Sequence, residues 1–238
     1  MEYGELDSAN HVEKVKWIIT PTTHEQRYGC CNAVAVKKAA HQWKAGKCTK
    51  CGTRILVGKP GIATKSSNGK TTISWKKVIN ASGYKVYRAK SKRGKYELLK
   101  ITAALSYSDS SIVGGQNYYY KVTAYYKSGS TTINGRASDV VLQVGTLKKV
   151  SLRVKNKKKS TASLSWKKAD GAKKYQIYRA TRKKGKYSKI TTTKKLTYED
   201  TSLSKNKTYY YKVRAYYVKA GKNIYGSYSN VKSVKITR

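Results

Sequence analysis

Residues 56–238 consist of short runs in which apolar and polar side chains alternate, separated by turn signals such as Asn68-Gly69. Alternation with a period of two is typical of β-strands that bury one face, and no segment shows the period of a helix. The longest runs are 118–126 and 209–217. The side chains predicted to point inward on these two runs are Tyr118, Tyr120, Val122, Ala124, Tyr209, Tyr211, Val213 and Ala215.

The pattern is written twice, because residues 56–146 and 147–237 align without a gap at a constant offset. A repeat of this length is a whole small domain rather than a solenoid unit. About seven strand-like runs per copy suit a sandwich of two antiparallel sheets. We therefore predict three units: a small module at 1–55 and two sandwiches at 56–146 and 147–238. Matched positions include Trp75 and Trp166, Tyr87 and Tyr178, Gly94 and Gly185, and Tyr118 and Tyr209.

Each copy resembles a fibronectin type III domain. The resemblance rests on the Trp of the second strand, on a Tyr-Arg third strand, and on a motif that is complete in the second copy as Asp200, Leu203, Tyr209, Tyr211, Val213 and Ala215. The first copy has Ile112 in place of the Leu, and Gly114-Gly115 where the family usually has Pro. The resemblance implies an all-β fold of two tandem, seven-stranded, Ig-like sandwiches whose corner tyrosines are Tyr118 and Tyr209. The sequence pattern Tyr-Arg-Ala/Ser-x-x-x-x-Gly-Lys-Tyr is similar to that of secreted or cell-surface proteins of anaerobic Gram-positive gut bacteria.

Charge adds a partner class to this picture. The chain has 52 basic and 11 acidic side chains, a net charge of +41. There are 9 basic and 5 acidic residues in 1–55, 15 and 3 in 56–146, and 28 and 3 in 147–238. Such a field attracts polyanions. We expect anionic polymers such as cell-wall polymers or glycans as partners, with a protein partner as a further option and a monomeric chain.

Nucleic acid is the alternative partner. Aromatic side chains that stack on bases would favour it, and Tyr119, Tyr126, Tyr210 and Tyr217 are the candidates. Cross-strand packing of these tyrosines against lysines is the plainer interpretation. Lys greatly outnumbers Arg, whereas bidentate base contacts are mainly made by Arg.

No run approaches the roughly 18 apolar residues of a membrane span. Residues 1–5 are acidic where a signal peptide is basic, and no apolar stretch follows them. We expect the chain to be a fragment of an extracellular or cell-surface protein.

All four Cys lie between residues 30 and 51, so the sandwiches are predicted to fold without disulfides. Cys48-x-x-Cys51-Gly52 has the spacing of half a zinc site. The expected ligands of a structural Zn²⁺ are Cys31, His41, Cys48 and Cys51, with Cys30 and His24 as alternates. The motif His-x-Trp-x-x-Gly-x-Cys-x-x-Cys-Gly at 41–52 also resembles small zinc-ribbon-like modules of bacterial surface proteins.

Two disulfides or free thiols are the alternatives to zinc. A unit of about 50 residues needs a stabilising cross-link such as a metal ion or a disulfide, because its hydrophobic core is too small to stabilise it alone. We expect Trp17, Trp43, Ile18 and Ile19 to cover the site.

The sequence carries no signature of an enzyme. All three His lie in the Cys-containing module, so the sandwiches lack the commonest general base. Asp109 and Asp200 are expected to be turn residues, and Asn134-Gly135-Arg136 is expected to form a hairpin turn. A zinc ion with four protein ligands has no open position for catalysis. The predicted function is a non-catalytic spacer or adhesion segment, with a nucleic-acid-binding protein as the alternative.

Overall fold

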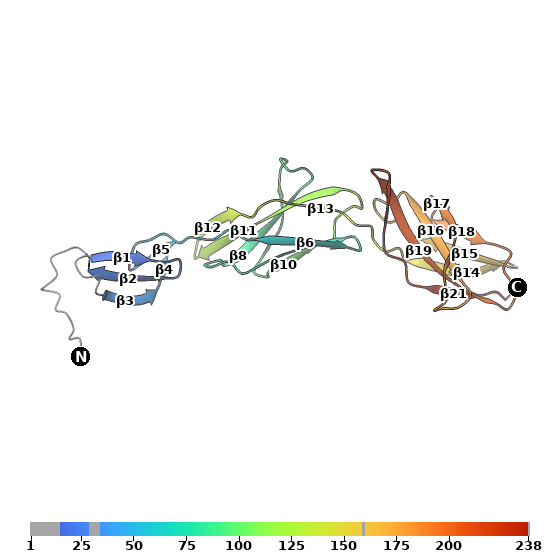
Figure 1. The fold of residues 1–238 in the computed structure, drawn as a ribbon, viewed down its shortest axis with the longest axis horizontal. Helices are drawn as coiled ribbons and strands as arrows, with labels where there is room; N and C mark the ends of the chain where they lie inside the picture. Colours follow the sequence, from blue (N-terminus) through green and yellow to red (C-terminus); the bar gives the residue numbers. More distant parts are fainter. Residues whose placement is uncertain (1–14, 29–33, 159, 238) are drawn as a thin grey trace.

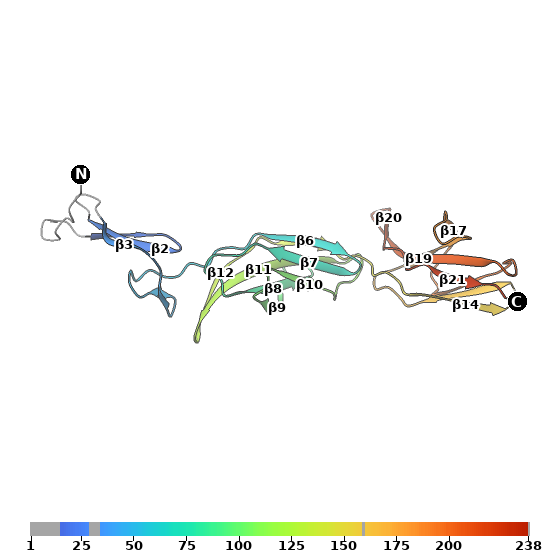
Figure 2. The same cartoon turned by 90° about the horizontal axis from the view of Figure 1, so that it is seen from below.

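The computed structural model describes residues 15–28, 34–158 and 160–237, and all of their regular structure is β. Their strands fall into three groups that follow one another along an elongated molecule (Figures 1 and 2). The predicted all-β class with two tandem sandwiches is confirmed. Among these residues there is no helix with the length and apolar character needed to cross a bilayer.

The first group is a small antiparallel sheet followed by a hairpin. The sheet has the order β1-β2-β3, and the hairpin pairs β4 with β5. The bounds are Val15–Ile19 for β1, Thr23–Tyr28 for β2, Val34–Ala40 for β3, Trp43–Lys44 for β4 and Lys47–Cys48 for β5.

The second group is a sandwich of two sheets. One sheet has the order β10-β7-β6, and the other has the order β12-β11-β8-β9, with β13 also paired to β11. Because β12 and β13 border the same strand, they form one final edge in two segments, which makes seven strands in all. The bounds are Ile62–Ser67 (β6), Lys70–Trp75 (β7), Gly83–Ala89 (β8), Glu97–Thr102 (β9), Ser106–Asp109 (β10), Asn117–Ser128 (β11), Thr131–Ala137 (β12) and Val141–Val144 (β13).

The third group repeats this topology. Its sheets have the orders β14-β15-β18 and β17-β16-β19-β20, with β21 also paired to β19. The bounds are Leu152–Lys158 (β14), Thr161–Trp166 (β15), Lys174–Ala180 (β16), Ser188–Thr193 (β17), Thr197–Asp200 (β18), Thr208–Lys219 (β19), Lys222–Tyr225 (β20) and Lys232–Lys235 (β21).

The cores form where the inward faces of the two sheets meet. All eight side chains predicted to point inward on β11 and β19 are buried. Trp75 packs on Tyr84 with ring centroids 5.3 Å apart, and Trp166 packs on Tyr175 at 5.6 Å. The substitution of Ile112 for Leu203 is conservative, because both are buried at equivalent places.

The corner tyrosines make the hydrogen bond that the resemblance implies. The backbone N–H of Val113 donates to the hydroxyl of Tyr118 at 2.9 Å, and that of Ser204 donates to Tyr209 at 3.1 Å. The loops close in both copies although neither contains the usual Pro.

The prediction of a turn at Asn134-Gly135-Arg136 was wrong. These residues lie inside β12, where Asn134 pairs with Tyr125. A Cβ at Gly135 would lie 2.5 Å from the carbonyl oxygen of Val57, so the strand passes directly against the segment that enters the first sandwich. This close approach explains the glycine without any turn.

The two sandwiches contact each other through hydrogen bonds between their loops and through the segment that connects them. The backbone N–H of Gly114 donates to the carbonyl of Asp170 at 3.2 Å, and that of Lys149 donates to Asn68 Oδ1 at 2.7 Å. Leu147, in the connecting segment, is buried in the core of the second sandwich. Gly114-Gly115 therefore has a reason to differ from its counterpart in the second copy, because this loop borders the next repeat.

Candidate metal centre

Four potential ligands converge from different elements of the N-terminal group. His24 lies on β2, His41 follows β3, Cys48 ends β5, and Cys51 lies in the turn beyond it. The hairpin that carries Cys48 turns through Ala45 and Gly46, with φ of 48° and 78°. Two positive φ angles define the tight turn that matches strand twist, so this hairpin is short and well specified.

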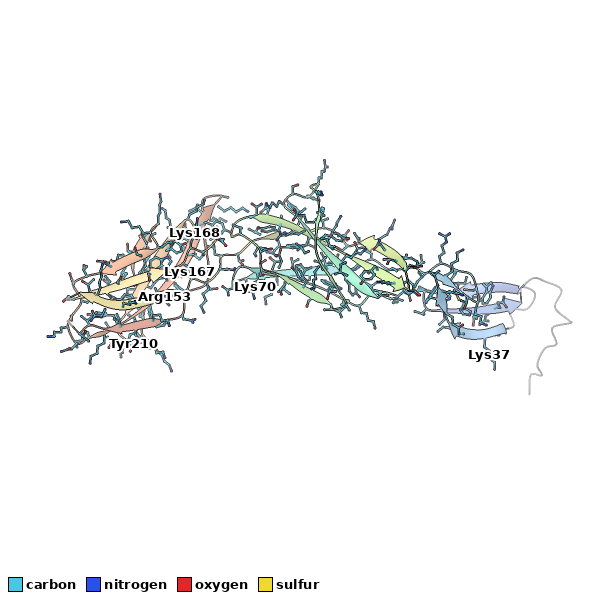
Figure 3. All side chains as sticks on the ribbon, turned by 180° about the vertical axis from the view of Figure 1, so that it is seen from behind. Lys37, Lys70, Arg153, Lys167, Lys168 and Tyr210 are labelled. Carbon is cyan, nitrogen blue, oxygen red and sulfur yellow. The ribbon has the colours of Figure 1, made fainter. Side chains whose placement is uncertain are left out.

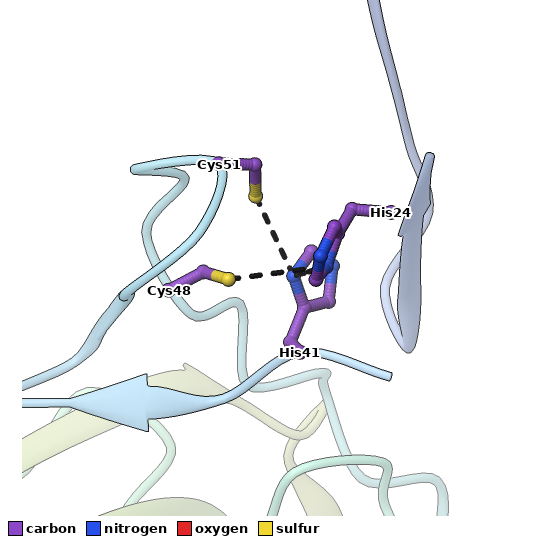
Figure 4. A group of neighbouring side chains, drawn as sticks. All are labelled: His24, His41, Cys48 and Cys51. Atoms are coloured by element: carbon purple, nitrogen blue, oxygen red, sulfur yellow. Dashed lines mark hydrogen bonds between the residues drawn. The ribbon is translucent and has the colours of Figure 1, made fainter. Parts of the chain in front are cut away.

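The ligand atoms of His24, His41, Cys48 and Cys51 all lie within 4.8 Å of one another (Figure 4). The two histidine Nδ1 atoms are 3.2 Å apart. Cys48 Sγ is 3.9 Å from His24 Nδ1, and Cys51 Sγ is 3.6 Å from His41 Nδ1.

These separations suit a tetrahedral zinc site. Zn–N bonds of about 2.0 Å and Zn–S bonds of about 2.3 Å place tetrahedral ligands about 3.3 Å apart for two nitrogens and about 3.5 Å apart for nitrogen and sulfur. The observed distances are close to these edges, and two imidazoles with two thiols form a donor set that Zn²⁺ accepts. The residues present therefore fit a zinc ion.

Outer contacts orient the ligands as a zinc site requires. His41 Nε2 lies 2.9 Å from the carbonyl oxygen of Thr20, to which it donates when Nδ1 faces the metal. The backbone N–H of Lys50 points at Cys48 Sγ at 3.4 Å. A hydrogen bond to sulfur of this kind stabilises the thiolate form.

Aromatic side chains cover the ligands, as predicted for Trp17 and Trp43. The Trp17 ring meets His24 at 5.3 Å between centroids, and the Trp43 ring lies 4.6 Å from that of His41. The same prediction for Ile18 and Ile19 was wrong, because both side chains are exposed. They lie on a three-stranded sheet that has too few elements to bury two adjacent residues.

The electrostatics favour one thiolate. Burial opposes ionisation of Cys48, but hydrogen bonds from the backbone of Cys51 and from His41 outweigh it and lower its pKa to about 6. Burial raises the pKa of Cys51, and the neighbouring Cys48 adds to the increase. Burial would lower the pKa of His41, yet the contact with Cys48 raises it. Cys48 is thus the natural first ligand for a cation.

The structure brings three of the four predicted ligands together, namely His41, Cys48 and Cys51, with His24 from the alternates beside them. Cys31 and its alternate Cys30 lie outside the described residues. Cys48 and Cys51 are free thiols. In the described part of the chain no other group of three or more His, Cys, Asp or Glu side chains is placed to hold a metal ion.

The hairpin that carries Cys48 also touches the first sandwich, and this contact was not predicted from the sequence. A Cβ at Gly46 would lie 2.2 Å from Cδ1 of Ile133 on β12. Asn80 donates from Nδ2 to the carbonyl of Pro21 at 3.2 Å and to that of Leu56 at 3.1 Å. Asn80 has a φ of 63°, which only the structure shows, and the sequence alone carried no signal of this contact.

Comparison with known proteins gives short matches. No family model matches the chain. It is 36% identical over 66 residues to an amylopullulanase of Thermoanaerobacter thermohydrosulfuricus, a match that covers 27% of this chain and 4% of that protein. It is 40% identical over 65 residues to a poly(3-hydroxybutyrate) depolymerase of Ralstonia pickettii, covering 27% and 12%. The chain therefore spans a small fraction of the curated relatives that it matches.

Among solved structures, the chicken interferon gamma receptor alpha chain is similar with a TM-score of 0.49 and 15% identity, covering 75% of this chain and 98% of that one. The matched segments of the two enzymes are too small to be whole catalytic proteins.

Proposed function

We propose that the chain is a non-catalytic modular segment of a bacterial cell-surface or secreted protein, in which two sandwiches space and attach other parts. Short matches to two polymer-degrading enzymes support this role, because each match is a small piece of a much longer protein. The proposed units are 1–55, 56–146 and 147–238.

The observation that carries the proposal is the contrast between core and surface in the two copies. Equivalent core side chains are buried in both, from Trp75 and Trp166 to Val122 and Val213. Outside these positions the copies differ in charge, since 147–238 contains 28 basic residues and 56–146 contains only 15. A fold kept constant under a changing surface charge supports a function on the surface, and a positive surface supports an anionic polymer as its ligand.

We assign the N-terminal module a structural Zn²⁺ held by His24, His41, Cys48 and Cys51. When bound, the ion would cross-link the sheet to the hairpin and supply the stability that so small a unit lacks. Four protein ligands leave no position for a substrate, so the site supports folding rather than catalysis.

Binding titrations of the full chain test the proposed function. We expect heparin and a teichoic acid to bind at low ionic strength, with affinity that falls at physiological ionic strength. Single-stranded DNA should bind more weakly than either polymer when salt is raised. Tight DNA binding that survives physiological salt would contradict the proposal, and absence of binding to any polymer at low salt would leave only the spacer role.

A further inference from the structure

The outer face of the sheet β17-β16-β19-β20 carries tyrosines packed around two cations. Tyr178 on β16 is in register with Lys212 on β19, and Gln176 is in register with Arg214. Three tyrosines at the ends of the neighbouring strands complete the group: Tyr187 directly precedes β17, Tyr225 ends β20, and Tyr228 follows β20. We call this surface the tyrosine–cation face, and it consists of Tyr178, Tyr187, Lys212, Arg214, Tyr225 and Tyr228.

Lys212 lies among three rings. Its Nζ is 4.2 Å from the ring centroid of Tyr228, 4.4 Å from that of Tyr187 and 6.0 Å from that of Tyr178. The Tyr178 and Tyr228 rings meet edge to face at 5.2 Å. These contacts hold the ammonium group in one place, because each ring attracts it electrostatically.

Arg214 is held still more closely. Its Cζ lies 3.8 Å from the ring centroid of Tyr225 and 4.9 Å from that of Tyr228. Its Nε donates to Gln176 Oε1 at 3.0 Å, and its Nη2 donates to the hydroxyl of Tyr178 at 2.9 Å. A guanidinium has five N–H donors, so the remaining ones are available to a ligand.

Within the described part of the chain, no carboxylate forms an ion pair with either of these two cations. The acidic residues of 147–238 are Asp170, Glu199 and Asp200, and none lies on the five strands of this sheet. An incoming anion therefore displaces no internal partner. The rings already hold these two long side chains in place, so a ligand that binds them loses less side-chain conformational entropy.

The first repeat has only half of this face. Tyr87, Tyr96 and Lys121 occupy the equivalent positions, and Lys121 Nζ lies 4.2 Å from the Tyr96 ring centroid. The equivalents of Arg214, Tyr225 and Tyr228 are Thr123, Asn134 and Ala137. The same scaffold is thus present with and without the second cation and two of its rings.

We propose that the tyrosine–cation face binds an acidic polysaccharide, with sugar carboxylates on Arg214 and Lys212 and sugar hydroxyls and ring edges against the exposed edges and hydroxyls of the tyrosines. The proposal names the site and ligand class for the anionic-polymer binding put forward above, and it rests on that function. A planar carboxylate matches the fork of Arg214, which makes bidentate contacts of high directionality. Tyrosine presents both an apolar ring and a hydroxyl, which suits the mixed surface of a sugar.

Nucleic acid suits this face less well. Base stacking needs open aromatic faces, whereas Tyr178, Tyr187 and Tyr228 are half-buried and have cations packed on them. Tyr217, one of the tyrosines considered for stacking on sequence grounds, is buried in the core of the second sandwich. It contacts the position of Gly115 rather than solvent.

The test is a binding titration of the full chain with polygalacturonate, poly(glycerol phosphate) and single-stranded DNA at physiological ionic strength. The variant R214T/Y225N/Y228A gives the second repeat the side chains of the first, and it should lose about tenfold or more in affinity for polygalacturonate. The reciprocal variant T123R/N134Y/A137Y should gain affinity. Thermal unfolding of each variant establishes that it is folded.

The matched control is K167S/K168S, which removes two charges that directly follow β15 and so lie with the opposite sheet (Figure 3). It should change affinity by less than about twofold, because it leaves the rings and fork intact. An equal loss in the control and the triple variant would overturn the site. So would tighter binding of poly(glycerol phosphate) or DNA through the same residues. If wild type binds but the triple variant binds equally well, the site fails and the proposed function stands. If wild type binds none of these polymers at low ionic strength either, the polymer-binding function fails too.

Discussion

The hydroxyl of Tyr120 donates a 2.8 Å hydrogen bond to Oδ2 of Asp109, and both side chains are fully buried. Arg88 Nη1 contacts the same oxygen at 2.8 Å. The backbone N–H and the hydroxyl of Ser111 donate to Oδ1. Asp109 is therefore more than the turn residue expected from the sequence: it is the acceptor at the centre of a buried network. The second repeat builds the Tyr–Asp–Arg part of this network from Tyr211, Asp200 and Arg179.

We expect Asp109→Asn to lower the free energy of unfolding by about 3 kcal/mol, because it leaves the guanidinium of Arg88 without its buried partner. Urea denaturation measures the change, and hydrogen exchange in β8 and β11 locates it. The control is Asp139→Asn. Asp139 contacts Lys59 at 2.7 Å, but its side chain is 89% exposed. This substitution should change stability by about 0.5 kcal/mol or less. Equal effects of the two substitutions would contradict the assigned role of Asp109.

The network also predicts a pH dependence. Burial would raise the pKa of Asp109, but hydrogen bonds from Ser111, Tyr120 and Arg88 outweigh burial and hold its pKa below the usual value. The folded chain thus binds this proton more weakly than the unfolded chain does. The stability that Asp109 contributes is present above the unfolded pKa of about 3.9 and is lost as pH falls through the folded value.

The measurement is the difference in unfolding free energy between wild type and Asp109→Asn from neutral pH downward. It should stay constant at first and then shrink once the pH is below about 4. A difference that remained unchanged in strong acid would show that the carboxylate charge is not what stabilises the fold.

Alternation along the chain was enough to predict the inward faces of β11 and β19, because a period of two with one buried face fixes the side on which each residue lies. It could not predict the ion pair between Arg88 and Asp109. Those residues are 21 positions apart on strands of different sheets, and their meeting depends on how the sheets pack. The sequence pattern around an aspartate at the end of a strand is the same whether its carboxylate faces solvent or a buried arginine.

The metal centre was predictable to a similar extent. Cys48 and Cys51 follow from spacing alone, since two thiols two residues apart can reach one ion. The place of His24 was open, because it depends on the pairing of β2 with β3. That register puts His24 opposite Ala39, two residues before His41, and thereby brings the two imidazoles together.

Zinc analysis distinguishes the two ligand sets. Wild type should carry one Zn²⁺ per chain by native mass spectrometry, and both Cys48→Ser and His24→Ala should greatly reduce it. The sandwiches should keep their thermal stability, because their cores contain neither residue. The matched control is C30S/C31S, which should retain the ion. Loss of zinc in that control together with retention in His24→Ala would replace His24 by Cys30 or Cys31 in the set.

The last prediction concerns the junction between the repeats. Gly171 has φ of 84°, and a Cβ there would lie 2.1 Å from the carbonyl oxygen of Gly114 in the other sandwich. Gly171→Ala should therefore separate the two loops, lose the 3.2 Å hydrogen bond from Gly114 to Asp170, and change the small-angle scattering profile. Gly221 is the matched control, since its φ is 72° and no atom lies within 4 Å of a Cβ built there.

Both substitutions place an alanine in the left-handed region, at a similar cost of about 1 to 2 kcal/mol. Only Gly171→Ala adds a clash between repeats, so the difference between the two variants measures the junction itself. A change in scattering for Gly171→Ala alone would mean that the loop contact sets the angle between the sandwiches. Identical profiles for both variants would mean that Leu147 and the bond from Lys149 to Asn68 hold that angle without it.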